Sequence, residues 1–214
     1  METIRPYQPK DSDNIRSICL INAGNPKTKR DQDFILDTYC DYYIECEPDN
    51  CFVAANEKDE AIGYIYCAEN YAKYQARFNE KYLPKVKELG YFKWKASLGS
   101  YRLHAKYAAQ YPAHLHIDIL DEYQRKGLGS KLVNALSEHL RAKGIGGLML
   151  TVGRTNELGI NFYKKYGFKE LEKASAMSRW GLNYKHTLKN RQSFDLSENV
   201  YARNWGETNG NTKL

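Results

Sequence analysis

With 214 residues, of which 42% are hydrophobic, the chain is long enough to bury the core of one domain, and its formal net charge is +6. No apolar run approaches the length of a membrane span, and no hydrophobic segment at the N-terminus suggests secretion. The sequence therefore predicts a cytoplasmic protein without membrane association.

Cysteine usage agrees with this prediction. The cysteines are odd in number and scattered, at positions Cys19, Cys40, Cys46, Cys51 and Cys67. No C-x-x-C motif occurs, and no histidine lies at zinc-ligand spacing from them. We expect reduced thiols that behave as small hydrophobic side chains, and no metal site.

Strand and helix patterns alternate in the first third of the chain. The predicted elements are a strand at residues 3–7, a helix capped by Asp11 or Ser12, a helix from Asp31 or Asp33 to about Tyr42, and a hairpin of strands 51–55 and 61–67. Gly63 interrupts the second strand of the hairpin, which favours a bulge there.

Residues 69–112 are basic and aromatic. Tyr74, Phe78 and Tyr82 recur four apart, so they share one face of a helix that ends near Pro84, and a second helix is expected at about 101–109. Residues 73–106 hold nine Lys or Arg against two Glu, a net charge of +7, so the rest of the chain sums to −1. The positive charge of the protein belongs to this stretch.

Three interpretations of the basic stretch stay open. It could bind nucleic acid, it could cover a binding site as a lid that attracts an anionic ligand, or its aromatic rings could simply pack on the domain. No RNA- or DNA-binding motif occurs in the sequence, so we do not expect a nucleic-acid partner.

The central pattern is a strand, a glycine-rich turn and a long helix. Residues 115–120 predict a short buried strand, residues 124–129 a tight turn, and the leucines of residues 128–143 recur four apart, as on an amphipathic helix. The first turn of such a helix has unpaired N–H groups and a partial positive charge. Because Gly127 and Gly129 carry no Cβ, a diphosphate could approach this backbone closely.

The motif Q-x-x-G-x-G after a strand resembles the pyrophosphate loop of the GCN5-related N-acetyltransferase (GNAT) superfamily. A second GNAT signature resembles the later string Asn156, Ile160, Phe162, Tyr163, Tyr166, Gly167 and Phe168. Because both occur in the right order and spacing, the chain is identified as a member of this superfamily.

The resemblance implies an α/β (α+β) fold, the GNAT fold, in which a mixed, mostly antiparallel central sheet is flanked by helices. Residues 1–206 would form one domain, with 69–112 as a helical insertion, 177–182 as a closing strand and 207–214 as a frayed tail. The implied activity is acetyl transfer from acetyl-CoA to the amine of a small molecule or a protein. A non-catalytic acyl-CoA-binding or interaction module is the alternative, and a homodimer stays open.

For the cofactor, the resemblance implies that backbone groups of Ile119 and Leu120 pair with pantetheine and that their strand splays from its neighbour after Ile119. It also assigns the pyrophosphate to a loop formed by Gln124, Arg125, Lys126, Gly127, Leu128, Gly129 and Ser130. Asn156 matches a position that binds pantetheine, or else it caps the helix that follows.

For catalysis, Tyr163 occupies the position of a tyrosine that protonates the CoA sulfur in many members; alternatively, it packs beside Ile160. On the predicted strand, His116 and Asp118 share one face because side chains alternate. Unpaired polar groups on a central strand are costly, so this pair is either a catalytic base or a structural tie between strands.

The polar strand H-x-H-x-D, preceded by Tyr-Pro-Ala, also resembles the acetyltransferase-like domain associated with O-GlcNAc hydrolases. This second resemblance covers about a third of the chain.

Overall fold

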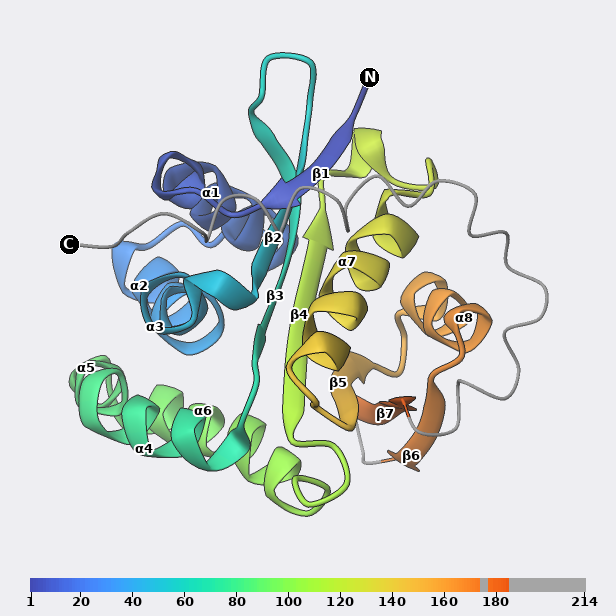
Figure 1. Ribbon diagram of the computed structural model, residues 1–214. Helices are drawn as coiled ribbons and strands as arrows, with labels where there is room; N and C mark the ends of the chain where they lie inside the picture. The colour runs from blue at the N-terminus through green and yellow to red at the C-terminus, as the bar shows by residue number, and fades with distance from the viewer. Residues whose placement is uncertain (174–176, 185–214) are drawn as a thin grey trace, which may run out of the picture. The chain divides into compact units, whose positions relative to one another are not determined.

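A computed structural model describes residues 1–173 and 177–184 of the chain. Seven described strands form one sheet in the order β1-β2-β3-β4-β5-β7-β6, antiparallel except between β4 and β5 (Figure 1). The strands are β1 (Thr3–Pro6), β2 (Cys51–Ala55), β3 (Ala61–Ala68), β4 (Ala113–Ile119), β5 (Gly147–Gly153), β6 (Lys169–Lys173) and β7 (Met177–Asn183). The predicted mixed, mostly antiparallel sheet is confirmed.

Helices cover both faces of the sheet (Figure 1). They are α1 (Ser12–Asn22), α2 (Lys29–Tyr39), α3 (Asp41–Cys46), α4 (Tyr71–Lys81), α5 (Leu83–Glu88), α6 (Tyr91–Ala105), α7 (Leu128–Ala142) and α8 (Glu157–Tyr166). One core cluster lies between α7 and one face of the sheet. A second core cluster, rich in tyrosine, lies between the other face and helices α1, α2, α3 and α4. In the described part of the chain no helix is long and apolar enough to cross a membrane.

The helix expected from Asp31 or Asp33 to Tyr42 is two helices. α2 begins earlier because the hydroxyl of Thr28 accepts the N–H of Asp31 at 3.1 Å. The break falls at Cys40, whose backbone (φ −127°, ψ −64°) leaves the helical region. The irregularity expected at Gly63 is present, since the β2–β3 register shifts where Ala54 pairs with Gly63 and Ala55 with Ala61.

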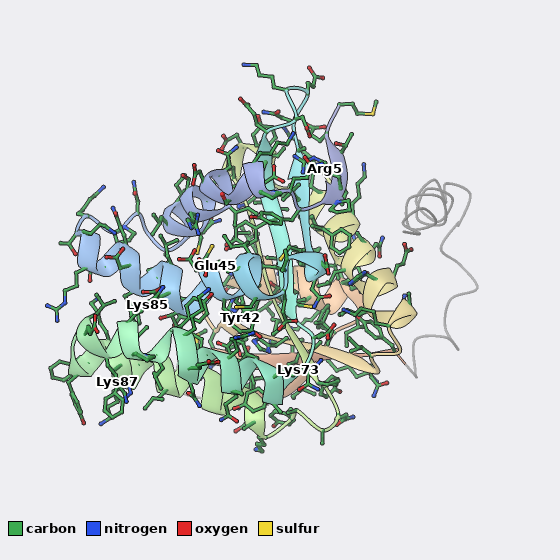
Figure 2. All side chains as sticks on the ribbon, turned by 60° about the vertical axis from the view of Figure 1, so that its left-hand side comes forward. Arg5, Tyr42, Glu45, Lys73, Lys85 and Lys87 are labelled. Atoms are coloured by element: carbon green, nitrogen blue, oxygen red, sulfur yellow. The ribbon has the colours of Figure 1, made fainter. Side chains whose placement is uncertain are left out.

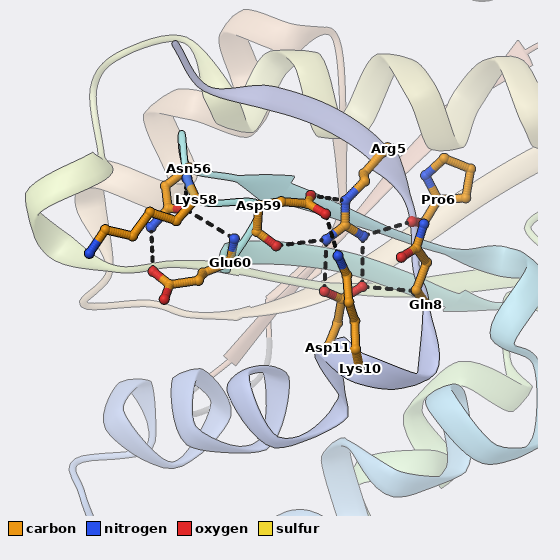
Figure 3. A network of polar contacts seen from close by, with 9 residues as sticks. All are labelled: Arg5, Pro6, Gln8, Lys10, Asp11, Asn56, Lys58, Asp59 and Glu60. Carbon is orange, nitrogen blue, oxygen red and sulfur yellow. Dashed lines mark hydrogen bonds and ion pairs between the residues drawn. The ribbon is translucent and has the colours of Figure 1, made fainter.

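The cap predicted for the first helix differs in detail. Asp11 occupies the cap position of α1 but makes no capping hydrogen bond there. Its carboxylate instead accepts two hydrogen bonds from Arg5, at 2.7 and 2.8 Å, and one from the N–H of Gln8 (Figure 3). Arg5 also donates to Asp59 in the β2–β3 turn, at 2.7 Å. This network ties β1 to the hairpin and to the start of α1.

The insertion contains three helices. The sequence predicted a helix at about 101–109, whereas α6 runs from Tyr91 to Ala105 and includes the glycine-bounded stretch. The turn lies at Gly90, whose φ of +112° is in the region that favours glycine. Gly99 remains inside the helix.

The charge of the insertion is matched by acidic groups elsewhere in the fold. Lys81 pairs with Glu45 at 2.6 Å, Lys85 with Asp37 at 3.3 Å, and Lys93 with Asp31. These carboxylates belong to α2 and α3, against which the insertion lies (Figure 2). Lys106 likewise pairs with Glu172 of β6, whereas Lys73 pairs with Glu69 at the start of the insertion itself.

The aromatic face of the insertion is buried. Tyr74, Phe78 and Tyr82 are at most 4% exposed and belong to the tyrosine-rich core. They are therefore not available to stack on bases, which favours the interpretation in which this face packs on the domain.

β7 confirms the predicted closing strand, and Tyr184 beyond it is buried, with its hydroxyl donating to Ser137 at 3.2 Å. Residues 1–184 form one compact unit. The predicted extension of the domain to residue 206 and the predicted tail at 207–214 fall, beyond Tyr184, outside the described residues.

Replacing Phe78 with Ala should destabilise the fold by about 3–5 kcal/mol, because the ring is 1% exposed and its loss leaves a cavity under the insertion. Phe92, in the same insertion, is 86% exposed, so Phe92→Ala should change stability by less than about 0.5 kcal/mol. Urea unfolding of both variants measures the difference. Equal effects would contradict the docking of the insertion through its aromatic face.

Candidate active site

The site is organised by the divergence of β4 and β5. Their parallel pairing covers only Ala113 with Leu148 and His114 with Met149. The strands therefore separate after His114, not after Ile119 as predicted. Each strand follows its antiparallel partner instead: β4 stays paired with β3 as far as Ile119, and β5 pairs with β7 along its whole length.

Gly63 holds β3 close to β4. A Cβ at this position would lie 2.9 Å from the side chain of Ile119 and 3.0 Å from the carbonyl oxygen of Asp118. Any larger residue would push β4 away from β3. The glycine therefore keeps the end of β4 on the β3 side and away from β5.

Backbone groups of β4 alternate between β3 and the space beside β5. The N–H of Leu120 donates to the carbonyl of Ile62 at 3.0 Å, so this amide faces β3 and is not available to pantetheine, contrary to the prediction. By the antiparallel alternation, the backbone groups of Ile117 and Ile119 face β5. Ile117 was missed, although strict alternation from Ile119 could have identified it.

The backbone of the predicted pyrophosphate loop has the conformation and the unpaired N–H groups that an anion site requires. Arg125 and Gly127 have φ of +59° and +81°, and a Cβ at Gly127 would meet no atom within 4 Å. Within residues 1–173 and 177–184, the N–H groups of residues 125–130 donate no hydrogen bond. This concave run of amides at the start of α7 suits an anion, and Lys126 and Arg125 at its rim are exposed.

The side chains of the loop have separate tasks. The amide of Gln124 donates to the carbonyl of Ile119 and to Asp121, both at 2.9 Å, so it holds the loop against the end of β4. Leu128 is 3% exposed and anchors α7 in the core. Gly129 faces Phe162, whose ring would lie 3.3 Å from an added Cβ, and Ser130 is exposed. Only backbone groups of Leu128 could reach a ligand.

Asp118 is a carboxylate with a neutral partner. It lies opposite Tyr64 on β3, and the Tyr64 hydroxyl donates to its Oδ2. Burial raises the pKa of the Asp118 carboxyl to about 6, and the hydrogen bond from Tyr64 opposes part of this rise. The group is thus mostly ionised at pH 7 and can still accept a proton.

His116 does not pair with Asp118. Its Nε2 lies 3.0 Å from the hydroxyl of Tyr43 on α3, and that hydroxyl is also 3.0 Å from Nε2 of His114. Burial lowers the pKa of His116 to about 4, so the ring is neutral at pH 7. The two residues share the predicted face but have different tyrosine partners, so the expected His–Asp contact is absent among the described residues.

Tyr163 lies on α8, on the far side of the sheet from Asp118. Its ring contacts Phe162 and Phe168, with centroids 5.3 and 5.6 Å away. Burial raises the pKa of Tyr163, and the negative charge of Asp118 raises it further. The hydroxyl is therefore close enough to sense the charge of Asp118, and it stays protonated.

Asn156 caps α8. Its side-chain oxygen accepts the N–H of Gly159 at 2.8 Å, and a Cβ at Gly159 would lie 2.9 Å from the Asn156 amide nitrogen. The capping role left open by the sequence is thus present. Asn156 as a whole is exposed.

Comparisons with known proteins agree with this geometry. The acetyltransferase (GNAT) family profile matches residues 20–168. The solved structure of SsHAT is similar to this chain with a TM-score of 0.75 and 24% identity, covering 85% of this chain and 98% of that one. PaiA N-acetyltransferase from Thermoplasma acidophilum, in complex with coenzyme A, is similar with a TM-score of 0.53 and 16% identity, covering 86% of this chain and 99% of that one.

A polyamine N-acetyltransferase from Drosophila melanogaster gives a TM-score of 0.60 at 12% identity, covering 86% of this chain and 100% of that one. At these identities the structural similarities establish the fold alone. The family profile spans more than half of the chain and includes the loop, both diverging strands and α8. The chain belongs to the acetyltransferase (GNAT) family, whose general activity is acetyl transfer from acetyl-CoA.

Proposed function

We propose that the protein is an N-acetyltransferase that moves the acetyl group of acetyl-CoA to an amine by direct attack of the amine on the thioester. One observation carries the proposal. A carboxylate with a pKa near neutrality, Asp118, lies on β4 beyond its last pair with β5, and its negative charge reaches the protonated hydroxyl of Tyr163 on α8.

The residues around this opening fit acetyl-CoA as the donor. Backbone amides of residues 125–130 would hold the diphosphate, and the space above Gly127 admits it without a clash. The outward backbone groups of Ile117 and the N–H of Ile119 would pair with the pantetheine arm, as a neighbouring strand would, while the Ile119 carbonyl accepts from Gln124. An N–H group in that position also polarises the thioester carbonyl and stabilises the charge that develops on its oxygen.

Asp118 is the group we assign as the base. An amine of ordinary pKa is neutral only about once in 10³ molecules at pH 7, so removal of its proton limits the attack. The Asp118 carboxylate is ionised at that pH, and it is free of any ion pair with the described residues. It lies on the sheet face opposite α7, the face covered by α1 to α3.

Tyr163 is the group we assign as the acid. The departing thiolate needs a proton, and a tyrosine whose pKa is raised holds its proton until a strong base appears beside it. The carboxylate of Asp118 contributes to that rise, so the charge of the proposed base helps to keep the proposed acid protonated.

Replacing Gly127 with Ala should weaken CoA binding about tenfold or more, because a Cβ there would occupy space that the diphosphate needs. Gly144, at the other end of α7, is the matched control: its φ is +73° and it too has open space around it. Both variants should lose about 1 kcal/mol of stability from left-handed strain. Calorimetric titration with CoA compares them, and equal affinities would contradict the loop assignment.

Asp118→Asn should lower kcat/KM by about 10²–10⁴-fold, because an amide cannot accept the proton of the amine. In the wild type, kcat/KM should fall as the pH drops through about 6, where the carboxylate becomes protonated. That decline should vanish in Asp118→Asn and persist in Glu122→Gln, which alters an exposed carboxylate nearby. A thiol-release assay across pH measures it, and an unchanged profile in Asp118→Asn would rule out this base.

Tyr163→Phe should lower kcat about 10²-fold while acetyl-CoA binding is retained, because the ring remains and only the proton donor is lost. Tyr166→Phe, on the same helix, removes a hydroxyl that donates to Asn134 and should leave kcat unchanged. Single-turnover kinetics with binding measured in parallel separate the two effects. A wild-type protein that binds acetyl-CoA but turns over no amine would instead be a non-catalytic acyl-CoA-binding module.

A further inference from the structure

Three histidines and one tyrosine form a buried cluster beside the candidate base. The Tyr43 hydroxyl is 3.0 Å from Nε2 of His114 and 3.0 Å from Nε2 of His116. The ring of His104, from α6, stacks on His114 with centroids 4.3 Å apart. His114 and Tyr43 are each 1% exposed, so bulk solvent does not reach these contacts.

The Tyr43 hydroxyl cannot serve both imidazoles in the same way. Burial lowers the pKa values of His114 and His116, so both rings are neutral and each carries a single N–H. A tyrosine hydroxyl has one proton, which it can donate to one acceptor at a time, and the side chain of Tyr74 is a further hydrogen-bond partner of Tyr43. If both contacts are hydrogen bonds, at least one ring must donate its own proton from Nε2.

The surroundings of His114 decide which ring is the donor. Nδ1 of His114 is buried without a partner, whereas Nδ1 of His116 is not enclosed in this way. A proton on Nδ1 of His114 would be a buried N–H without an acceptor, which proteins avoid more strictly than an unused acceptor. His114 therefore carries its proton on Nε2 and donates it to the oxygen of Tyr43.

We propose that Tyr43 is a positioning residue that fixes the tautomer of His116. Because its oxygen accepts from His114, its hydroxyl donates to Nε2 of His116 and so holds that ring with its proton on Nδ1. The proposal rests on the proposed acetyl transfer for its functional meaning. Since Nε2 is occupied, the nitrogen that His116 can offer to a ligand is Nδ1, and in this tautomer Nδ1 is a hydrogen-bond donor.

With this tautomer, Asp118 and His116 on β4 have different roles. Asp118, two residues further along the same face, accepts the proton of the amine, whereas His116 donates a hydrogen bond to an oxygen or a lone pair of the bound reactants. A donor that is already oriented stabilises developing charge without the cost of reorganisation. In the His–Asp motif of the strand, His116 is then the hydrogen-bond donor and is held by Tyr43. Asp118 is the proton acceptor and is held by Tyr64.

The tautomer can be measured without any activity. Long-range ¹H–¹⁵N correlation spectra of histidine-labelled protein distinguish a ring protonated on Nδ1 from one protonated on Nε2, and His116→Gln assigns the signal. We expect wild-type His116 to be protonated on Nδ1 and His114 on Nε2. A wild-type His116 protonated on Nε2 would overturn the proposal.

Tyr43→Phe tests the cause. The phenylalanine keeps the ring that stacks on Tyr66, with centroids 4.6 Å apart, and removes only the hydroxyl. His116 should then shift, at least in part, to the Nε2-protonated form. Tyr66→Phe is the control, since the Tyr66 hydroxyl donates to the carbonyl of Tyr39 and not to an imidazole. An unchanged His116 tautomer in Tyr43→Phe would refute the positioning role even if the wild type has the expected tautomer.

Kinetics connect the tautomer with the reaction. Tyr43→Phe should lower kcat about tenfold with KM for acetyl-CoA unchanged, because the donor is misoriented in part of the molecules and not removed. A rise in KM alone, or a loss equal to that of Tyr66→Phe, would contradict a positioning role. If the wild type transfers no acetyl group, the proposed function fails, while the spectra still decide whether Tyr43 sets the tautomer.

Discussion

The separation of β4 from β5 after His114 is the constraint on which the site depends. Backbone N–H and C=O groups inside a sheet require partners, and a central strand that leaves its parallel neighbour exposes a row of them. Beyond His114, β4 continues its ladder with β3 as far as Ile119 and β5 continues with β7, so the edges of β4 and β5 that face each other are no longer paired. The edge of β4 at Ile117 and Ile119 is thus left without a strand partner, apart from the Ile119 carbonyl that accepts from Gln124, and a ligand that resembles a peptide strand would fit it.

The same strand carries polar side chains that a sheet interior does not normally accept, and tyrosines make this possible. Tyr43 supports His114 and His116, and Tyr64 supports Asp118. The insertion contributes to this support, since Tyr74 of α4 packs edge-on against His114 at 4.6 Å. Its lysines pair with carboxylates of α2, α3 and other segments, so the charge of the insertion serves to hold it in place beside the polar strand.

The sequence predicted those parts of the site that depend on local pattern. The turn at Gly127, the helix after it and the shared face of His116 and Asp118 follow from spacing within a few residues. The partners of that face could not be predicted in this way, because Tyr43 is 71 residues from His114 and Tyr64 is 54 from Asp118. The point of divergence was placed too late for a similar reason: it is set by the ladders that β3 and β7 form, not by β4 itself.

The choice of tyrosine as the partner of Asp118 has a chemical consequence. A cation in contact with this carboxylate would favour its ionised form and hold its pKa below the usual value, which would make it a poor base. A neutral hydroxyl only partly offsets the burial, so the pKa of Asp118 stays near 6. The same burial, together with the charge of Asp118, raises the pKa of Tyr163. Burial thus shifts both groups upward, which in the proposed reaction would make the carboxylate a better proton acceptor and keep the proton on the phenol until the thiolate forms.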